Sequence, residues 1–177
     1  MMATGGNGRR RVLSLLGGVV LSLSLALVWT SFQPASAQSG KKVRKVRRHI
    51  KKRVKRQIGA PYSYGGMSPG GFDCSGLTKW TFKRHTSLPH STTSQFELAG
   101  ERNAKRVWRR GKLRKGDLVF FDTTSSRVGH AGVYIGHGGF VSATSSSGVR
   151  KDSVWDPYYW GPRYVGATRL GVTRYGS

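Results

Sequence analysis

The chain has 177 residues, of which 31 are Lys or Arg, 7 are Asp or Glu and 1 is Cys, so its formal net charge is +24. This length allows one domain of ordinary size, and the single cysteine excludes an internal disulfide and any zinc site built on a cysteine pair. A hydrophobic content of 37% with 5 Trp, 7 Tyr and 7 Phe excludes disorder throughout. The charge predicts an anionic partner but does not identify it.

Residues 1–37 have the pattern of an export signal. Three arginines at 9–11 precede an uncharged, mostly apolar run over 12–29, and Ala-Ser-Ala at 35–37 offers the small residues that a signal peptidase needs. We predict cleavage before Gln38 and therefore a secreted or cell-wall-associated protein, for which no nucleic-acid partner is expected. The paired arginines hint at twin-arginine export. The alternative is an uncleaved membrane anchor, because the run is close to the shortest length that spans a bilayer.

A basic amphipathic helix is predicted over residues 38–57, leading into the domain. Residues 41–56 contain 11 Lys or Arg and no acid, and apolar residues recur at spacings of three and four from Val43 to Val54. That spacing puts the apolar residues on one helical stripe. One interpretation is a helix laid on the domain with a charged solvent face. The other is an anchor to anionic wall polymers or anionic lipid headgroups.

The remaining chain, 58–177, changes to a mixed, Gly-rich composition and is predicted to form one α+β domain. Helical spacing comes first and apolar strand patterns follow, which is typical of this class. The helices are expected near 75–83 and 92–98, and the strands near 118–121, 130–135, 140–144 and 165–170.

Cys74 and His130 are the strongest candidates for chemistry. Cys74 follows Asp73 at the expected N-terminus of a helix, where free N–H groups and the helix dipole favour a thiolate, which is a strong nucleophile. The alternative is a buried, inert cysteine. Among the 5 histidines, His130 ranks first as the proton acceptor, because it opens a predicted strand that would hold its side chain in place.

Several separated motifs resemble those of the NlpC-type cell-wall cysteine peptidases, over roughly residues 45–170. They are GAPYSYGG at 59–66, DCSGLTKW at 73–80, KGDLVFF at 115–121, HAGVYIG at 130–136 and GFVSATSSSGV at 139–149. Agreement of several motifs in order is far more specific than a lone Asp-Cys-Ser-Gly. The resemblance implies a reduced papain-like fold, with the Cys-bearing helix packed on an antiparallel sheet of about five to six strands. It also implies hydrolysis of amide bonds in peptidoglycan stem peptides, without a metal or organic cofactor.

The resemblance also assigns roles to residues. Cys74 corresponds to the nucleophile and His130 to the base. Tyr62 matches a tyrosine near the oxyanion site, where its hydroxyl and the Cys74 backbone N–H are the expected donors. Asp73 and Ser75 match positions that contact substrate in some members of the family.

The chain departs from the family pattern at the third polar residue, which commonly is His and follows the base by twelve positions. That position here is Ser142. If the loop of the predicted hairpin is 136–138, Ile135 faces Gly139 and Thr144 lies opposite His130, with Ser142 on the diagonal. A serine bridges that diagonal only through water. Three possibilities stay open: Ser142 orients His130, Thr144 does so, or no polar residue does and Ser142 is a plain strand residue.

A second departure and three aromatic residues complete the sequence observations. His90 stands where the family often has Arg. Trp108, Trp155 and Trp160 are candidates for stacking on sugars, although packing in the core or at its rim is the interpretation we favour.

The leading prediction is therefore a secreted cysteine endopeptidase acting on bacterial peptidoglycan. One rival is a wall-binding module that kept the fold while its site decayed at Ser142; the presence of both Cys74 and His130 argues against it. Another rival is a membrane-active antimicrobial protein driven by residues 41–56. The sequence determines neither the bond that is cut nor the oligomeric state.

Overall fold

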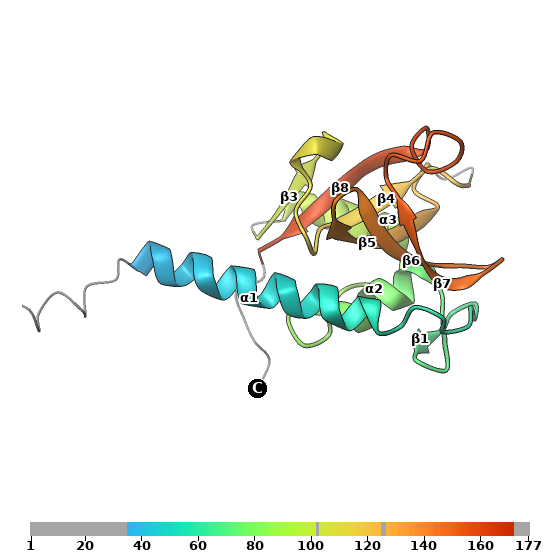
Figure 1. Cartoon of the computed structure of the whole chain (residues 1–177), viewed down its shortest axis with the longest axis horizontal. Helices are drawn as coiled ribbons and strands as arrows, with labels where there is room; N and C mark the ends of the chain where they lie inside the picture. The colour runs from blue at the N-terminus through green and yellow to red at the C-terminus, as the bar shows by residue number, and fades with distance from the viewer. Residues whose placement is uncertain (1–34, 102, 125–126, 172–177) are drawn as a thin grey trace, which may run out of the picture. The chain divides into compact units, whose positions relative to one another are not determined.

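The computed structural model describes residues 35–101, 103–124 and 127–171 (Figure 1). All but the first of them belong to one compact unit that starts at Ser36. The predicted export signal lies outside the described residues, except for Ala35-Ser36-Ala37. These three residues are the beginning of the first helix, and cleavage after them stays a prediction. No helix in the described part of the chain is long and apolar enough to cross a membrane.

A six-stranded antiparallel sheet organises the described residues, with strand order β3-β8-β4-β5-β6-β7. The strands are β3 (Ala104–Val107), β8 (Tyr164–Leu170), β4 (Leu118–Phe121), β5 (His130–Gly136), β6 (Gly139–Thr144) and β7 (Gly148–Ser153). The short strands β1 (Met67–Ser68) and β2 (Gly71–Phe72) pair separately. The helices are α1 (Ala35–Lys55), α2 (Cys74–Phe82) and α3 (Thr92–Glu97), with short 3₁₀ turns η1 (Leu98–Gly100) and η2 (Arg110–Lys112).

The predicted α+β class and the size of the sheet are confirmed. Two strands of this sheet, β3 and β7, were not predicted from the sequence, and they lie at its opposite edges; the short strands β1 and β2 were not predicted either. Strands β3 and β7 each read as a mostly polar segment, AKRV and GVRKDS. An edge strand has one unpaired side in solvent, so it lacks the apolar run or strict alternation by which a strand is recognised in sequence.

Both faces of the sheet are covered, and strand β4 is buried on each. Its sequence LVFF is wholly buried because alternate side chains enter two cores. Leu118 and Phe120 join the core shared with α1 and α2. Val119 and Phe121 join a second core, rich in aromatic residues, that includes Trp160. The continuous apolar run therefore marks the centre of the sheet.

Helix α1 is packed on the domain through its apolar stripe. Val46, Ile50 and Val54 are fully buried in the first core, whereas Ile58, which follows the helix, is 44% exposed. Arg53 donates from Nε to the Trp80 carbonyl at 3.1 Å, and its guanidinium lies 3.6 Å from the centroid of the Trp80 ring. The first interpretation, a helix laid on the domain, is therefore correct for the apolar face of α1, which is buried against the domain. The stripe is not available for insertion into a lipid bilayer.

A buried carboxylate, Asp117, ties α1 to the sheet. Asp117 is fully buried and accepts hydrogen bonds from Arg47 at 3.1 Å and from Arg169 at 2.9 and 2.7 Å. The backbone N–H of Arg114 donates to it at 2.8 Å. Arg47 also donates to the Leu170 carbonyl at 3.2 Å. One buried acid thus neutralises cations from the helix and from β8.

The β5–β6 hairpin has the predicted register along its strands but a different loop. Val133 pairs with Val141, which agrees with the prediction. Gly136 pairs with Gly139 after an irregularity, so Ile135 does not face Gly139 and the expected three-residue loop is wrong. The two loop residues His137 and Gly138 both have positive φ, 54° and 74°. That conformation makes a two-residue hairpin turn whose twist matches the strands, and the extra residue is absorbed as a bulge.

Candidate active site

The structure places Cys74 in the first turn of α2, with Asp73 as its N-cap. The Asp73 carboxylate accepts the Gly76 N–H at 2.6 Å and the Ser75 hydroxyl at 3.0 Å. The loop before the helix packs against this turn so closely that a Cβ at Gly76 would collide with the Gly66 carbonyl oxygen. The Asp-Cys-Ser-Gly motif is thus a capped helix start that needs a glycine for space.

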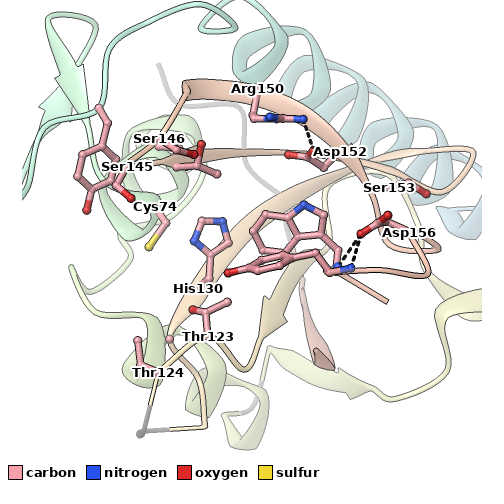
Figure 2. Close-up of a pocket in the computed structure, with 16 residues that line it drawn as sticks. Cys74, Thr123, Thr124, His130, Ser145, Ser146, Arg150, Asp152, Ser153 and Asp156 are labelled. Carbon is pink, nitrogen blue, oxygen red and sulfur yellow. Dashed lines mark hydrogen bonds and ion pairs between the residues drawn. The ribbon is translucent and has the colours of Figure 1, made fainter. Parts of the chain in front are cut away.

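His130 is the first residue of β5, where it pairs with Phe121 of β4. Its neighbour Ala131 donates its backbone N–H toward the sulfur of Cys74. Cys74 and His130 both line one cavity of about 840 Å³, and Figure 2 draws both side chains in it. The helix start and the sheet therefore bring together the two residues that the sequence singled out.

Burial sets the charge state of both groups. Burial raises the pKa of the Cys74 thiol above its usual value, although hydrogen bonds from the Ala131, Ser75 and Cys74 backbone N–H groups act in the opposite direction. Burial lowers the pKa of His130 to about 4. The free site at neutral pH is therefore a neutral thiol beside a neutral imidazole. The expected effect of the helix start is present, but desolvation outweighs it.

An aromatic ring, rather than a polar side chain, holds His130. The ring of His130 stacks on Trp160, with centroids 4.9 Å apart and planes tilted by 32°. Its Nε2 atom is buried and has no hydrogen-bond partner among the described residues. From the sequence, Trp160 is a candidate only for packing or sugar stacking, and no local pattern connects it with residue 130.

Ser142 carries a second buried polar atom without a partner in the described part of the chain, its Oγ. A Cβ at Gly132 would lie 3.2 Å from Ser142 Cβ, so these positions share a face of the sheet. His130, two residues before Gly132, is on that face as well. Thr144 differs, because its hydroxyl donates to the Gly148 carbonyl at 3.2 Å. Of the alternatives, Ser142 is the residue with an uncommitted hydroxyl.

Of the other predicted site residues, Tyr62 lines the cavity, whereas Asp73 and Ser75 do not. The pKa of Tyr62 is raised by burial and by the nearby Cys74 and Asp73 charges. His90 Nε2 lies 2.8 Å from Asp73 Oδ2, which also accepts the Gly65 N–H at 3.0 Å. His90 therefore holds the capping carboxylate, and the substrate contacts of Asp73 and Ser75 stay predictions.

The far wall of the cavity is polar and was not predicted. It carries Arg150 and Asp152, paired at 2.9 Å, and Asp156, which accepts the backbone N–H groups of Tyr159 and Trp160 (Figure 2). These residues come from β7 and the loop after it, where no sequence pattern indicates a site. Charges of both signs in the cavity suit a peptide that carries ionised groups. No group of three or more metal-ligating side chains occurs in the described residues.

An antiparallel sheet with a cysteine at the start of a packed helix and a histidine on the adjacent strand defines a papain-like hydrolase fold. The profile of the NlpC/P60 family matches residues 59–169, and the chain belongs to this family. The predicted family, fold and class of enzyme are thereby confirmed at the level of the family.

Named relatives share sequence with this chain over about 100 residues. The chain is 38% identical over 106 residues to murein DD-endopeptidase MepH of Escherichia coli, covering 58% of this chain and 38% of the relative. It is 36% identical over 102 residues to a probable endopeptidase p60 of Listeria innocua, covering 57% and 20%. It is 34% identical over 110 residues to a gamma-DL-glutamyl hydrolase of Bacillus subtilis, covering 60% and 25%. The chain thus spans less than half the length of each of these proteins.

Solved structures share the fold. An NlpC/P60 family protein from Bacillus cereus superimposes with a TM-score of 0.60 at 29% identity, covering 70% of this chain and 40% of the other. The NlpC/p60 domain of the peptidoglycan hydrolase SagA gives a TM-score of 0.57 at 26% identity, covering 70% and 98%.

Proposed function

We propose that this protein is a cysteine endopeptidase that hydrolyses amide bonds in the stem peptides of peptidoglycan. The observation that carries the proposal is the pairing of Cys74 and His130 in one cavity. The relatives named murein endopeptidase and peptidoglycan hydrolase support the substrate class. We further propose that the protein acts outside the cell, at the wall, after removal of residues 1–37.

The reaction starts from a neutral Cys74 thiol and a neutral His130 imidazole. His130 accepts the thiol proton as Cys74 Sγ attacks the scissile carbonyl carbon, so the thiolate forms only as it is used. The Cys74 backbone N–H and the Tyr62 hydroxyl stabilise the oxyanion. Protonated His130 then gives its proton to the leaving amine and a thioester remains. Water, deprotonated by His130, attacks the thioester and releases the new carboxylate and the thiol.

Mass spectrometry of muropeptides tests this proposal directly. Digestion of purified peptidoglycan is expected to give stem-peptide fragments with one new amino end and one new carboxyl end at a single type of amide bond. A Cys74→Ala chain is the control and should give none. Identical fragments from wild type and control would overturn the proposal.

The rival of a non-catalytic wall-binding module needs a test other than thiol labelling. Because burial raises the pKa of Cys74, slow alkylation at neutral pH is expected even of an active enzyme. Labelling therefore does not separate the two functions, and product formation does.

The third polar residue is proposed to be Ser142, acting on His130 Nε2 through a bridging water. We expect Ser142→Ala to lower kcat by roughly three- to tenfold with little change in KM, because one water-mediated hydrogen bond is lost while the Trp160 stack remains. Steady-state kinetics on a soluble stem peptide measure this. Unchanged kcat would make Ser142 a plain strand residue. Thr144→Val is the matched control.

The buried His130 should also make stability depend on pH. In the unfolded chain its pKa returns to about 6.5, whereas burial holds it at about 4 in the folded protein. Between these values only the unfolded chain binds the proton, so the free energy of unfolding falls as the pH falls. We expect a loss of about 2–3 kcal/mol from this residue between pH 7 and pH 4.5.

Urea unfolding at both pH values, for wild type and His130→Gln, measures this contribution. The variant should lose about that much less stability on acidification, and a His137→Gln variant should behave as wild type, since His137 is exposed. If wild type and His130→Gln lose the same free energy of unfolding on acidification, the pH dependence does not come from His130.

The exposed face of α1 is proposed to bind anionic wall polymers or anionic headgroups by charge alone. Eight of the 11 basic residues of segment 41–56 are exposed, whereas its apolar stripe is buried. Charge-driven binding weakens steeply with salt. If Lys52→Gln/Lys55→Gln leaves binding to walls and vesicles intact at low salt, this proposal fails. The buried stripe also argues against a membrane-active peptide function for segment 41–56.

A further inference from the structure

An exposed tryptophan, Trp108, stands at the edge of the sheet opposite the β7 side of the active-site cavity. It directly follows the edge strand β3, and 62% of its surface is accessible. It does not line the cavity that contains Cys74. An exposed indole is costly in water, and Trp is a residue type that binding surfaces use for large contact area.

Residues of neighbouring elements pack against one side of the Trp108 indole. Gly166 of β8 lies under it, because a Cβ at Gly166 would be 3.3 Å from Trp108 Cε3. Phe96 packs against it edge to face, with centroids 6.4 Å apart. The Arg106 guanidinium stacks on Phe96 at 3.3 Å and lies 5.6 Å from the Trp108 ring. The ring is thus a supported, outward-facing platform.

Cations surround this platform. A hollow of about 390 Å³ is lined by Trp108 and Val107 and by five cationic side chains, with no acid among its lining residues: Lys105, Arg106, Arg109, Lys112 and Arg169. A second hollow of about 280 Å³ shares Lys105 and Arg169 with the first and adds Arg47. The cationic surface therefore continues from one hollow into the next.

Not all of these charges are neutralised within the protein. Arg169 and Arg47 pair with Asp117, and the Glu97 charge acts on Arg106. Lys105, Arg109 and Lys112 have no ion-pair partner among the described residues. All three are exposed. They remain available for an anionic ligand.

We propose that Trp108 with Lys105, Arg109 and Lys112 forms a second binding site, for a wall polymer of alternating sugar and phosphate groups. The apolar C–H face of a sugar ring packs on an indole, and Arg and Lys bind the adjacent phosphates. Lys105 lines both hollows, which suits a chain-like ligand that extends from the first hollow into the second. A phosphate polymer is favoured over nucleic acid because the relatives of this chain are named for the cell wall. In this respect the inference rests on the proposed function.

Binding is measured with the full chain carrying Cys74→Ala, so that the result does not depend on catalysis. The probes are a purified sugar–phosphate wall polymer, polyphosphate without sugar, an uncharged chitin oligosaccharide and single-stranded DNA. Tryptophan fluorescence and calorimetry at 150 mM salt give the Kd. We expect the sugar–phosphate polymer to bind most tightly. Trp108→Ala should weaken it about tenfold, the size of effect that loss of one stacking platform gives.

Matched variants distinguish binding at the Trp108 site from non-specific attraction by the positive charge of the whole protein. Arg109→Gln/Lys112→Gln should weaken binding and lower its salt dependence. Lys52→Gln/Lys55→Gln removes the same charge from α1, whose binding by charge alone is expected at low salt and is largely screened at 150 mM salt. Trp155→Ala removes another exposed indole. At 150 mM salt each of these two variants should weaken binding less than twofold. Trp108→Ala should leave hydrolysis of a soluble stem peptide unchanged.

Three results would overturn the proposal. Polyphosphate that binds as tightly, with no effect of Trp108→Ala, would mean charge attraction alone. Tighter, Trp108-dependent binding of DNA would make this a nucleic-acid site. Equal weakening by the α1 variant would move the site to the helix. Normal binding without any peptide hydrolysis by the wild type would instead contradict the proposed function and leave this site standing.

Discussion

A Cys74→Ser chain is expected to lose at least about four orders of magnitude in kcat/KM on a stem-peptide substrate. The hydroxyl is much less acidic than the thiol, and His130, whose pKa burial lowers to about 4, is a weak base for it. The substitution is almost isosteric, so the N-cap of α2 and the cavity should be retained. The measurement is kcat/KM from fragments quantified by mass spectrometry, together with the unfolding midpoint.

The control for that loss is Ser75→Ala, which removes a neighbouring hydroxyl that does not line the cavity. We expect its kcat/KM to stay within about tenfold of wild type, because it removes a hydrogen bond to Asp73 and not the nucleophile. Substantial activity of Cys74→Ser would contradict the assignment of the nucleophile. A loss in both variants, accompanied by unfolding, would show damage to the helix start rather than to the chemistry.

Asp117→Ala is expected to have the largest effect on stability, about 3–5 kcal/mol in the free energy of unfolding. Asp117 is fully buried between Arg47 and Arg169. Its removal leaves two largely buried guanidinium groups facing each other without a counter-charge. Because Arg47 belongs to α1, the helix should also lose its ion pair with the sheet, while Val46, Ile50 and Val54 still pack in the first core.

Chemical denaturation measures the loss, and hydrogen exchange of the α1 amides shows whether the helix detaches first. Asp122→Asn is the matched control: it removes one acidic charge at an exposed position, so we expect a change below about 0.5 kcal/mol. A small loss for Asp117→Ala would mean that the three-residue ion cluster contributes little. In that case α1 would be held mainly by its buried apolar stripe and by the contacts of Arg53 with Trp80.

The structure also explains a departure that the sequence left without a reason. His90, the second departure from the family pattern, has its Nε2 atom 2.8 Å from Oδ2 of Asp73, the N-cap of α2. The Asp73 carboxylate also accepts the Gly76 N–H at 2.6 Å and so caps the start of α2. His90 therefore supplies a nitrogen contact to the capping carboxylate at the helix start.

The sequence by itself determined the α+β class, the capped helix start at Cys74 and the register of the hairpin that begins at His130. These features follow from local signals, since a cap, a turn and a period of two are written in neighbouring residues. The loop length was wrong because a bulge at Ile135 depends on the conformation of the turn.

Only the tertiary structure decided what surrounds the two reactive groups. The contact of Trp160 with His130 and the ion pairs of Asp117 join residues 30 or more positions apart. The polar wall at Asp152 lies on an edge strand that has no recognisable sequence pattern. The charge state followed from the same packing: the helix start favoured a thiolate, but desolvation in the folded domain raises the pKa of Cys74. Burial is a property of the whole packed domain, so no local stretch of sequence specifies it.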